Sequence, residues 1–114
     1  MPRQKRILSE YRGMWLFAMF DLPVDTREAR KQYAGFRKTL LRQGFSMLQF
    51  SVYARYCADE QRDEVLKKSL RKILPPRGEV RLLAVTDRQY GKMEIYEGKT
   101  RTETEKPPEQ LLLF

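Results

Sequence analysis

Carboxylates are the main side chains of this chain that could take part in catalysis or bind a metal ion. The 114 residues include no histidine and a single cysteine, Cys57. Without histidine there is no Ser-His-Asp triad and no imidazole base, and one cysteine cannot build a cysteine-cluster zinc site. Asp21 is the carboxylate in the best position, because it directly follows an apolar segment and precedes Leu22 and Pro23. A side chain at the end of a strand can face solvent or a ligand, although aspartate also suits a simple turn there.

Basic residues outnumber acidic ones, and they are unevenly distributed. The chain carries 23 lysines and arginines against 15 acidic residues, a formal net charge of +8. Residues 1–43 hold ten basic and four acidic residues, a net charge of +6, whereas residues 75–114 are neutral overall. A positive surface built from the first segment attracts phosphate and steers nucleic acid. We therefore expect a polyanionic partner, with an ordinary solvated basic surface as the alternative.

Length and apolar patterning limit the class of protein. A chain of 114 residues supports one small domain. Its longest apolar run, residues 14–20, is far too short to cross a membrane, and no long apolar stretch follows the basic start as a secretory signal would. One cysteine excludes an intrachain disulfide and fits a reducing compartment. The sequence thus predicts a cytoplasmic protein without a membrane partner.

The order of the first segments predicts a strand, a helix and then more strand. Residues 14–20 are expected to form an apolar strand covered on both faces. Asp25 and Glu28 have the spacing of a capping box at the start of a helix, and Gly44 suits the C-terminal cap of that helix. Residues 45–57 are longer than a usual strand and predict a tight hairpin or a strongly bent strand.

A second helix is predicted after Asp59, which suits its N-cap. Apolar residues at helical spacing are expected to form its buried stripe: Val65, Leu66, Leu70 and Ile73. Lysines and arginines in its last turns fit the negative end of the helix dipole, and two adjacent prolines end the helix.

The remaining segments complete a βαββαβ order. Residues 80–86 predict a strand, residues 92–96 a short edge strand and residues 97–109 a flexible polar tail. Two βαβ-type halves indicate an α+β ferredoxin-like sandwich, with one antiparallel sheet and both helices on one of its faces. The other face must be covered or used. Its apolarity favours a symmetric homodimer over the base-binding surface of an RNA-recognition module.

Several local sequences also follow one another in a familiar order. They are Phe20-Asp21-Leu22-Pro23, the basic helix after it, Gly44-Phe45 and Leu48-Gln49-Phe50-Ser51-Val52-Tyr53. Together they resemble the Cas-two family, CRISPR-associated protein two. Two further segments are most similar to its type II branch: Arg12-Gly13-Met14-Trp15 and Thr86-Asp87-Arg88-Gln89. The similarity extends from Tyr11 to Gly98 and depends on the order of the motifs rather than on any one of them.

The resemblance implies a ferredoxin-like homodimer that acts in CRISPR spacer acquisition. In that process the family bridges two dimers of the Cas-one integrase and holds the incoming double-stranded protospacer DNA. Members of the family are also described as metal-dependent endonucleases of RNA or DNA. The family's motif places its metal-binding aspartate at Asp21.

Asp21 is therefore the candidate catalytic and metal-binding residue, with Mg²⁺ as the expected cofactor. Two Asp21 carboxylates about 4 Å apart across a dimer axis would repel by roughly 4 kcal/mol at an effective dielectric constant of about 20. A shared divalent cation relieves that repulsion and activates a water, a task for which the chain has no histidine. Because no second acidic residue accompanies Asp21 in a motif, a scaffold role is favoured over efficient cleavage.

Phosphate contacts are expected mainly from the first helix and its flanks. Such contacts give affinity without sequence preference. The candidate DNA-binding residues are Arg12, Arg27, Arg30, Lys31, Arg37, Lys38, Arg42 and Arg55.

The chain ends in an apolar segment that is expected to dock on a partner. We divide the chain into a basic N-terminal arm (residues 1–10), the ferredoxin-like domain (11–97) and a C-terminal tail (98–114). The tail closes with Gln110, Leu111, Leu112, Leu113 and Phe114. These residues suit a strand added to a neighbouring sheet or an anchor in a groove. The partner subunit or the integrase is the expected place of docking, and the bacterial sliding clamp, whose binding motif is similar, is an alternative.

Three functions remain open on the sequence. They are a dimeric DNA-bridging component of the CRISPR integration complex, a freestanding Mg²⁺-dependent nuclease, and an RNA-recognition-like binding module. Sedimentation separates the third from the others, because such modules are often monomeric. Cleavage assays on the wild type and on Asp21→Ala separate the first from the second.

Overall fold

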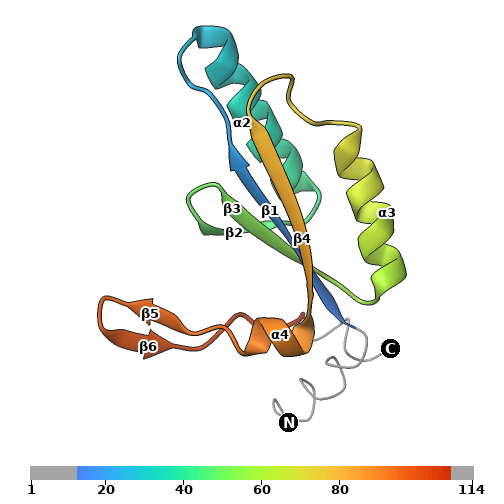
Figure 1. Cartoon of the computed structure of the whole chain (residues 1–114), viewed down its shortest axis with the longest axis vertical. Helices are drawn as coiled ribbons and strands as arrows, with labels where there is room; N and C mark the ends of the chain where they lie inside the picture. The colour runs from blue at the N-terminus through green and yellow to red at the C-terminus, as the bar shows by residue number, and fades with distance from the viewer. Residues whose placement is uncertain (1–12, 109–114) are drawn as a thin grey trace.

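Four antiparallel strands form the main sheet, and two long helices cover one of its faces (Figure 1). The computed structural model describes residues 13–108. Along the chain the elements are β1 (Met14–Asp21), α2 (Arg27–Arg42), β2 (Ser46–Gln49), β3 (Val52–Cys57), α3 (Glu60–Arg71), β4 (Glu79–Thr86), α4 (Asp87–Gly91), β5 (Ile95–Glu97) and β6 (Thr100–Thr102).

The strand order in the sheet is β2-β3-β1-β4. Strand β1 lies in the centre and pairs antiparallel with both β3 and β4, so that Met14 is opposite Cys57 on one side and Thr86 on the other. Each helix connects two strands that are separated in the sheet by a third, as a split βαβ unit requires: β3 lies between β1 and β2, and β1 lies between β3 and β4. This arrangement confirms the predicted α+β ferredoxin-like fold.

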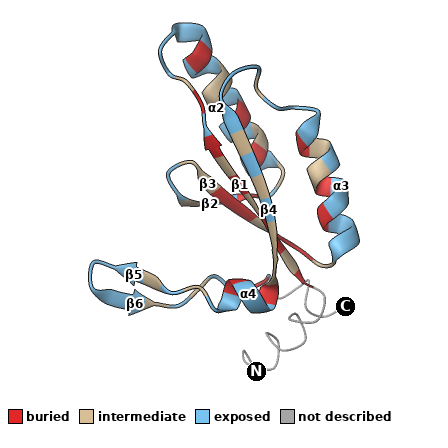
Figure 2. Cartoon of the chain, viewed as in Figure 1, coloured by how far each residue is buried: buried red, intermediate tan, exposed pale blue. Residues whose placement is uncertain are grey.

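Alternate residues of β1 face opposite sides of the sheet. Leu16, Ala18 and Phe20 are buried on the side that the helices cover. They pack in one cluster with side chains from α2 and α3, including Phe36 and Leu70. Figure 2 shows this buried interior together with the exposed outer sides of both helices.

The opposite side of the sheet, which α2 and α3 leave uncovered, is here called the open face. One end of it is closed by α4, where the ring of Trp15 stacks on Tyr90 with 3.9 Å between ring centroids. The indole nitrogen of Trp15 donates a hydrogen bond of 2.7 Å to the buried carboxylate of Asp87. Further along the open face Phe17 is only partly buried, and Leu83 is 50% exposed. The open face is thus covered at the α4 end and apolar but exposed in the middle.

Helix α2 starts one residue later than the sequence pattern indicated. Its N-cap is Thr26, whose side-chain oxygen accepts a hydrogen bond from the amide of Ala29. The expected capping box at Asp25 and Glu28 is therefore wrong. Asp25 instead accepts two hydrogen bonds, of 3.2 and 3.1 Å, from the guanidinium of Arg77. These hydrogen bonds lower the pKa of Asp25 below its ordinary value.

Helix α3 has the predicted N-cap, since Asp59 accepts a hydrogen bond from the amide of Arg62. Its buried stripe differs from the predicted one. Leu66 and Leu70 are buried, but Val65 is 64% exposed and Ile73 lies at the surface.

The charged residue Asp63 takes the remaining inward position of α3. Its carboxylate lies 3.2 Å from the ammonium of Lys67, one turn along the helix. Burial opposes the positive charge of Lys67, but its hydrogen bonds to Asp63 and Glu64 raise the pKa of Lys67 overall. The helical periodicity of apolar residues could not reveal this buried ion pair.

Residues 45–57 form a hairpin, as one of the two alternatives predicted. Strands β2 and β3 are joined by the two residues Phe50 and Ser51, and Ser51 has a positive φ of 65°. The register of the pair shifts between Met47 and Gln49, which marks an irregularity next to the turn.

The C-terminal strand forms but does not join the main sheet. Strand β5 pairs with β6 in a separate hairpin, which Figure 1 shows apart from the four-stranded sheet. Gly98, with a φ of 63°, permits the tight reversal that closes β5 onto β6. The expected flexible tail is wrong at this point, because Thr100–Thr102 is a strand and Glu105 accepts a hydrogen bond of 2.6 Å from the hydroxyl of Tyr90.

Candidate functional site

Asp21 is the last residue of β1, and it is exposed at the end of the open face that lies away from α4. Its Cα partner on β4 is Glu79, the first residue of that strand. Directly opposed residues of an antiparallel pair point to the same side of the sheet, with Cβ atoms about 5 Å apart. The fold therefore gives Asp21 the second carboxylate that no sequence motif indicated.

The sequence did not identify Glu79, because its pattern predicts the fourth strand from Val80 and has no means of fixing the register between that strand and β1. The register places Asp21 opposite Glu79.

A guanidinium group completes this acidic end of the sheet. The side chain of Arg81 donates a hydrogen bond of 2.7 Å to the carboxylate of Glu79. This bond lowers the pKa of Glu79, so the group is ionised at neutral pH. The pair is well exposed, with 71% of the Arg81 side chain and 61% of the Glu79 side chain accessible to solvent. Arg81 thus remains available to a phosphate group.

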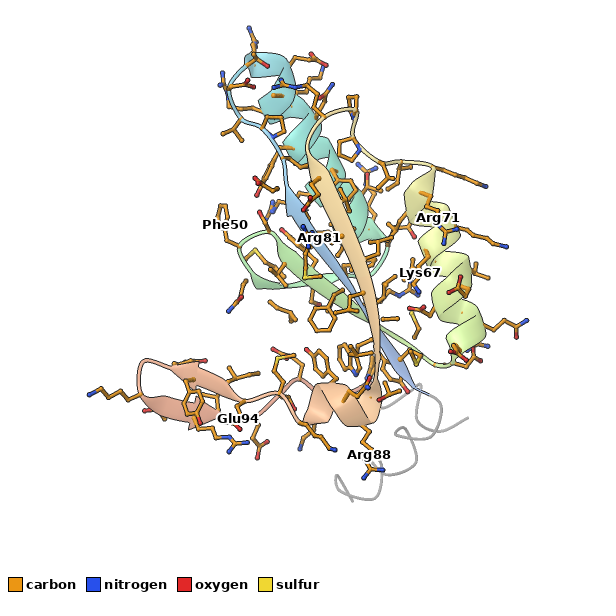
Figure 3. All side chains as sticks on the ribbon, in the orientation of Figure 1. Phe50, Lys67, Arg71, Arg81, Arg88 and Glu94 are labelled. Carbon is orange, nitrogen blue, oxygen red and sulfur yellow. The ribbon has the colours of Figure 1, made fainter. Side chains whose placement is uncertain are left out.

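Asp21, Glu79 and Arg81 share a shallow pocket with the β2–β3 turn. The pocket measures about 250 Å³, and its wall also includes Phe50 and Ser51. Figure 3 shows Phe50 projecting from the turn and Arg81 on β4, the edge strand on the other side of β1. The pocket therefore combines carboxylates, a guanidinium and an exposed aromatic ring.

The pocket can accept a metal ion only with outside ligands. Within residues 13–108, no cluster of three or more histidine, cysteine or acidic side chains is placed to hold a metal. Mg²⁺ commonly takes only one or two protein carboxylates and completes its octahedron with waters and substrate phosphates. Asp21 and Glu79 fit that coordination pattern.

The basic surface of α2 is the second candidate site, and all six of its predicted DNA-binding residues are exposed. Four of them lie at spacings of four, seven and four residues, which places them on one side of an α-helix. These four are Arg27, Lys31, Lys38 and Arg42. The side is opposite to the buried residues Ala29, Phe36 and Leu40. We call these four residues the α2 stripe.

The other two basic residues of α2 flank the stripe. Arg30 donates a hydrogen bond to the carbonyl of Val24, and Arg37 donates one of 2.8 Å to the hydroxyl of Tyr53. These bonds restrain both guanidinium groups close to the helix.

The two remaining predicted DNA-binding residues, Arg55 and Arg12, do not belong to α2. Arg55 is half-buried beneath the end of α2, where it donates a hydrogen bond of 2.7 Å to the carbonyl of Gln43. It therefore supports the helix end and is not part of the α2 stripe. Arg12 lies outside the described residues, as do the basic arm at 1–10 and the apolar segment Gln110, Leu111, Leu112, Leu113 and Phe114.

In the part of the chain from residue 13 to residue 108, no helix is long and apolar enough to cross a membrane.

Known proteins are similar to this sequence over most of its length. The family model described as CRISPR associated protein Cas2 matches residues 14–93. A "CRISPR-associated endoribonuclease Cas2" of Parvibaculum lavamentivorans is 52% identical over 101 residues, which cover 89% of this chain and 100% of that relative. Proteins of the same name in Flavobacterium psychrophilum and Paracidovorax avenae are 48% and 42% identical. The matches cover 94% and 95% of this chain, and 93% and 100% of those relatives. With the ferredoxin-like fold and an exposed aspartate at the end of its first strand, this chain belongs to the CRISPR associated protein Cas2 family.

Proposed function

We propose that this protein is a homodimeric component of CRISPR spacer acquisition. In this proposal it binds the double-stranded protospacer DNA through the α2 stripe and bridges two dimers of the Cas-one integrase. Mg²⁺-dependent phosphodiester cleavage at Asp21 is proposed as a second activity. The α2 stripe is the observation that carries the first of these roles.

The dimensions of the stripe suit a DNA backbone. From Arg27 to Arg42 the helix rises by about 22 Å, at about 1.5 Å per residue. A duplex advances by about 3.4 Å for each base pair, so the stripe spans roughly six base pairs. Its four side chains are exposed and cationic, and contacts from such groups to phosphates do not depend on the base sequence. Binding without sequence preference is what protospacers of arbitrary sequence require.

The open face supports the dimer. It holds Phe17 and the 50% exposed Leu83, and its outer strand β4 is an edge of the sheet. Exposed apolar surface beside an unpaired strand edge is a common site of association. A second copy of the chain on this face would leave the α2 stripe of each protomer outside, because α2 covers the opposite face of the sheet.

The name endoribonuclease, which the relatives carry, supports the second activity. Asp21 and Glu79 would hold the metal ion, which when bound supplies an activated water and neutralises charge on a phosphodiester oxygen. Arg81 would bind the phosphate, since its pair with Glu79 is exposed and such pairs are weak enough to exchange. Asp21, Glu79 and Arg81 would thus hold the metal ion and the phosphate at the end of β1, and the metal-activated water would take the place of a nucleophile generated by a histidine base.

Salt dependence of DNA binding tests the first role. The variant Lys31→Gln/Lys38→Gln removes two charges from the α2 stripe while keeping good helix-forming residues. The plot of log binding constant against log salt should become shallower by about 0.9 for each lost phosphate contact, or about 3.6 for both changes in both protomers. Filter binding or fluorescence anisotropy with a DNA duplex measures this slope.

Arg88→Gln/Lys92→Gln is the matched control, because it removes the same charge from exposed residues at α4. The control should retain nearly the whole slope. Equal slopes for the two double variants would refute the α2 stripe as the DNA-binding surface.

Asp21→Asn tests the second role, because it keeps the size of the side chain and removes its charge. We expect loss of metal-dependent cleavage of RNA or DNA with duplex binding unchanged. Glu79→Gln should weaken Mg²⁺ binding, so that a higher Mg²⁺ concentration is required for the half-maximal cleavage rate. Cleavage by rigorously purified Asp21→Asn at the wild-type rate would exclude this site as the source of the activity.

A further inference from the structure

A groove of about 350 Å³ lies between α3, the end of β3 and the end of α2. The buried residues Cys57 and Leu66 form apolar parts of its wall, and Val65 also lines it while remaining 64% exposed. None of these three residues takes part in the proposed binding of DNA or metal. The groove therefore offers apolar surface for which the proposed function has no use.

The groove is also positively charged. Arg55 and Arg62 line it, and none of the described residues in its wall is acidic. Arg55 is held there by its hydrogen bond of 2.7 Å to the carbonyl of Gln43, whereas Arg62 is exposed. Charge complementarity selects the partners of such a surface. The groove therefore suits an occupant that is mainly apolar and carries a negative charge.

Residues 109–114 of the same chain have this chemistry. They are one glutamate, one glutamine, three leucines and one phenylalanine, with no basic residue among them. They lie outside the described residues. A row of four large apolar side chains is rarely left in contact with water, so this segment needs a surface on which to dock.

The groove and α4 lie at the same end of the sheet, as Figure 1 shows for the end of β3 and the start of α4. Cys57 is opposite Met14 on β1, and Met14 is opposite Thr86, the N-cap of α4. The end of β3 and the start of α4 are therefore two strand spacings apart, or about 10 Å.

The chain leading to residues 109–114 is held next to α4. The hydroxyl of Tyr90 in α4 donates a hydrogen bond of 2.6 Å to Glu105, and Pro107 is buried. The six residues from Glu105 to Leu111 can span up to about 20 Å when extended. The apolar segment can therefore reach the groove of its own chain.

We propose that in the isolated protein residues 109–114 dock into this groove of their own chain, with the leucines against Val65 and Leu66 and Glu109 facing the guanidinium groups. Docking removes the apolar side chains from water without a second chain. The integrase is the proposed partner of the same segment, so the groove holds the segment until the integrase binds it. The docking itself does not depend on that function.

Disulfide formation with Cys57 tests the docking, because Cys57 is the single cysteine of the chain and lines the groove. Leu111→Cys, Leu112→Cys and Leu113→Cys are prepared separately as full-length proteins and treated with oxidised glutathione. On a non-reducing gel an intrachain disulfide leaves a monomer of altered mobility, and a disulfide between copies gives a dimer. Lys99→Cys is the control, since Lys99 is exposed in the turn between β5 and β6, which Figure 1 shows away from α3.

We expect at least one of the three tail cysteines to form the intrachain disulfide about tenfold faster than Lys99→Cys does. Val65→Glu places a negative charge in the groove and should slow this reaction to the rate of the control. Leu41→Glu should leave the rate unchanged, because Leu41 is 43% exposed on α2 but does not line the groove.

The proposal would be overturned if all three tail cysteines reacted no faster than Lys99→Cys. A disulfide-linked dimer in place of the monomer would assign the segment to a second copy of the chain and would also refute it. Equal slowing by Val65→Glu and Leu41→Glu would show that the segment docks elsewhere. Neither DNA binding nor cleavage is measured, so failure of this proposal is distinguishable from failure of the proposed function.

Discussion

Gly78 is the residue at which a single methyl group should most disturb the acidic end of the sheet. It precedes β4 with a φ of 89°, which a residue with a side chain rarely adopts. A methyl group at this position would lie 2.6 Å from the carbonyl oxygen of Asp21 and 2.8 Å from a methyl group of Leu22. The first of these atoms belongs to the backbone, so the end of β1 or the start of β4 must move. Gly78→Ala should therefore disturb the pairing of Asp21 with Glu79 at this end of the sheet.

Two contributions determine the cost of Gly78→Ala. The left-handed backbone costs about 1 kcal/mol for a residue other than glycine, and overpacking against backbone costs about 1–3 kcal/mol more. We expect a loss of about 3 kcal/mol in the free energy of unfolding, which lowers the Tm by roughly 10 °C or more. Urea denaturation followed by the fluorescence of Trp15, the single tryptophan, measures this at one fixed protein concentration.

Gly35→Ala is the matched control, because a methyl group at Gly35 meets no atom within 4 Å. Gly35 lies within α2, where alanine should raise the free energy of unfolding by about 0.5–1 kcal/mol. The two substitutions add the same group and should have effects of opposite sign. If the free energy of unfolding of Gly78→Ala is within about 0.5 kcal/mol of the wild-type value, the close approach of Gly78 to Asp21 does not constrain the fold.

Three further results are expected. Burial raises the pKa of the Cys57 thiol to about 11, and the charge of Asp63 adds to the effect, so alkylation of the native protein should accelerate only toward pH 11. Half-maximal reactivity near the ordinary pKa of 9.0 would contradict this. Lys67→Met should lower the free energy of unfolding by about 3 kcal/mol, because it leaves the buried Asp63 without its cation, and adding Asp63→Asn to the same chain should restore most of that loss. Strictly additive changes in the free energy of unfolding would argue against this ion pair. Deleting residues 110–114 should weaken assembly with the integrase on a sizing column while the homodimer persists, and an unchanged complex would exclude the tail as its docking segment.

Local sequence determined most of the secondary structure. The apolar run at residues 14–20, the N-cap at Asp59 and the hairpin within residues 45–57 all appear in the structure. These features depend on residues close together in the chain, because capping, turn formation and side-chain periodicity act over a few residues. The exposed end of β1 at Asp21 was predictable for the same reason.

Two of the wrong predictions failed because of contacts between residues that are far apart in the chain. Asp25 was expected to cap a helix, but its partner is Arg77, 52 residues away. The segment expected as a flexible tail is held in part by a hydrogen bond from Tyr90 to Glu105. The inward position of Asp63 has a different cause, because its partner Lys67 is one turn away on the same helix and a pattern of apolar residues cannot identify an inward-facing carboxylate.

The sequence by itself determined the order of the elements, the outward basic stripe of α2 and the carboxylate at the end of the first strand. Only the tertiary structure decided what stands beside that carboxylate. The register of β1 against β4 puts Glu79 opposite Asp21, and the strained turn at Ser51 puts Phe50 in the same pocket. Strand register depends on packing across the whole sheet rather than on neighbouring residues. For that reason a pocket assembled from three separate segments could not be predicted from any one of them.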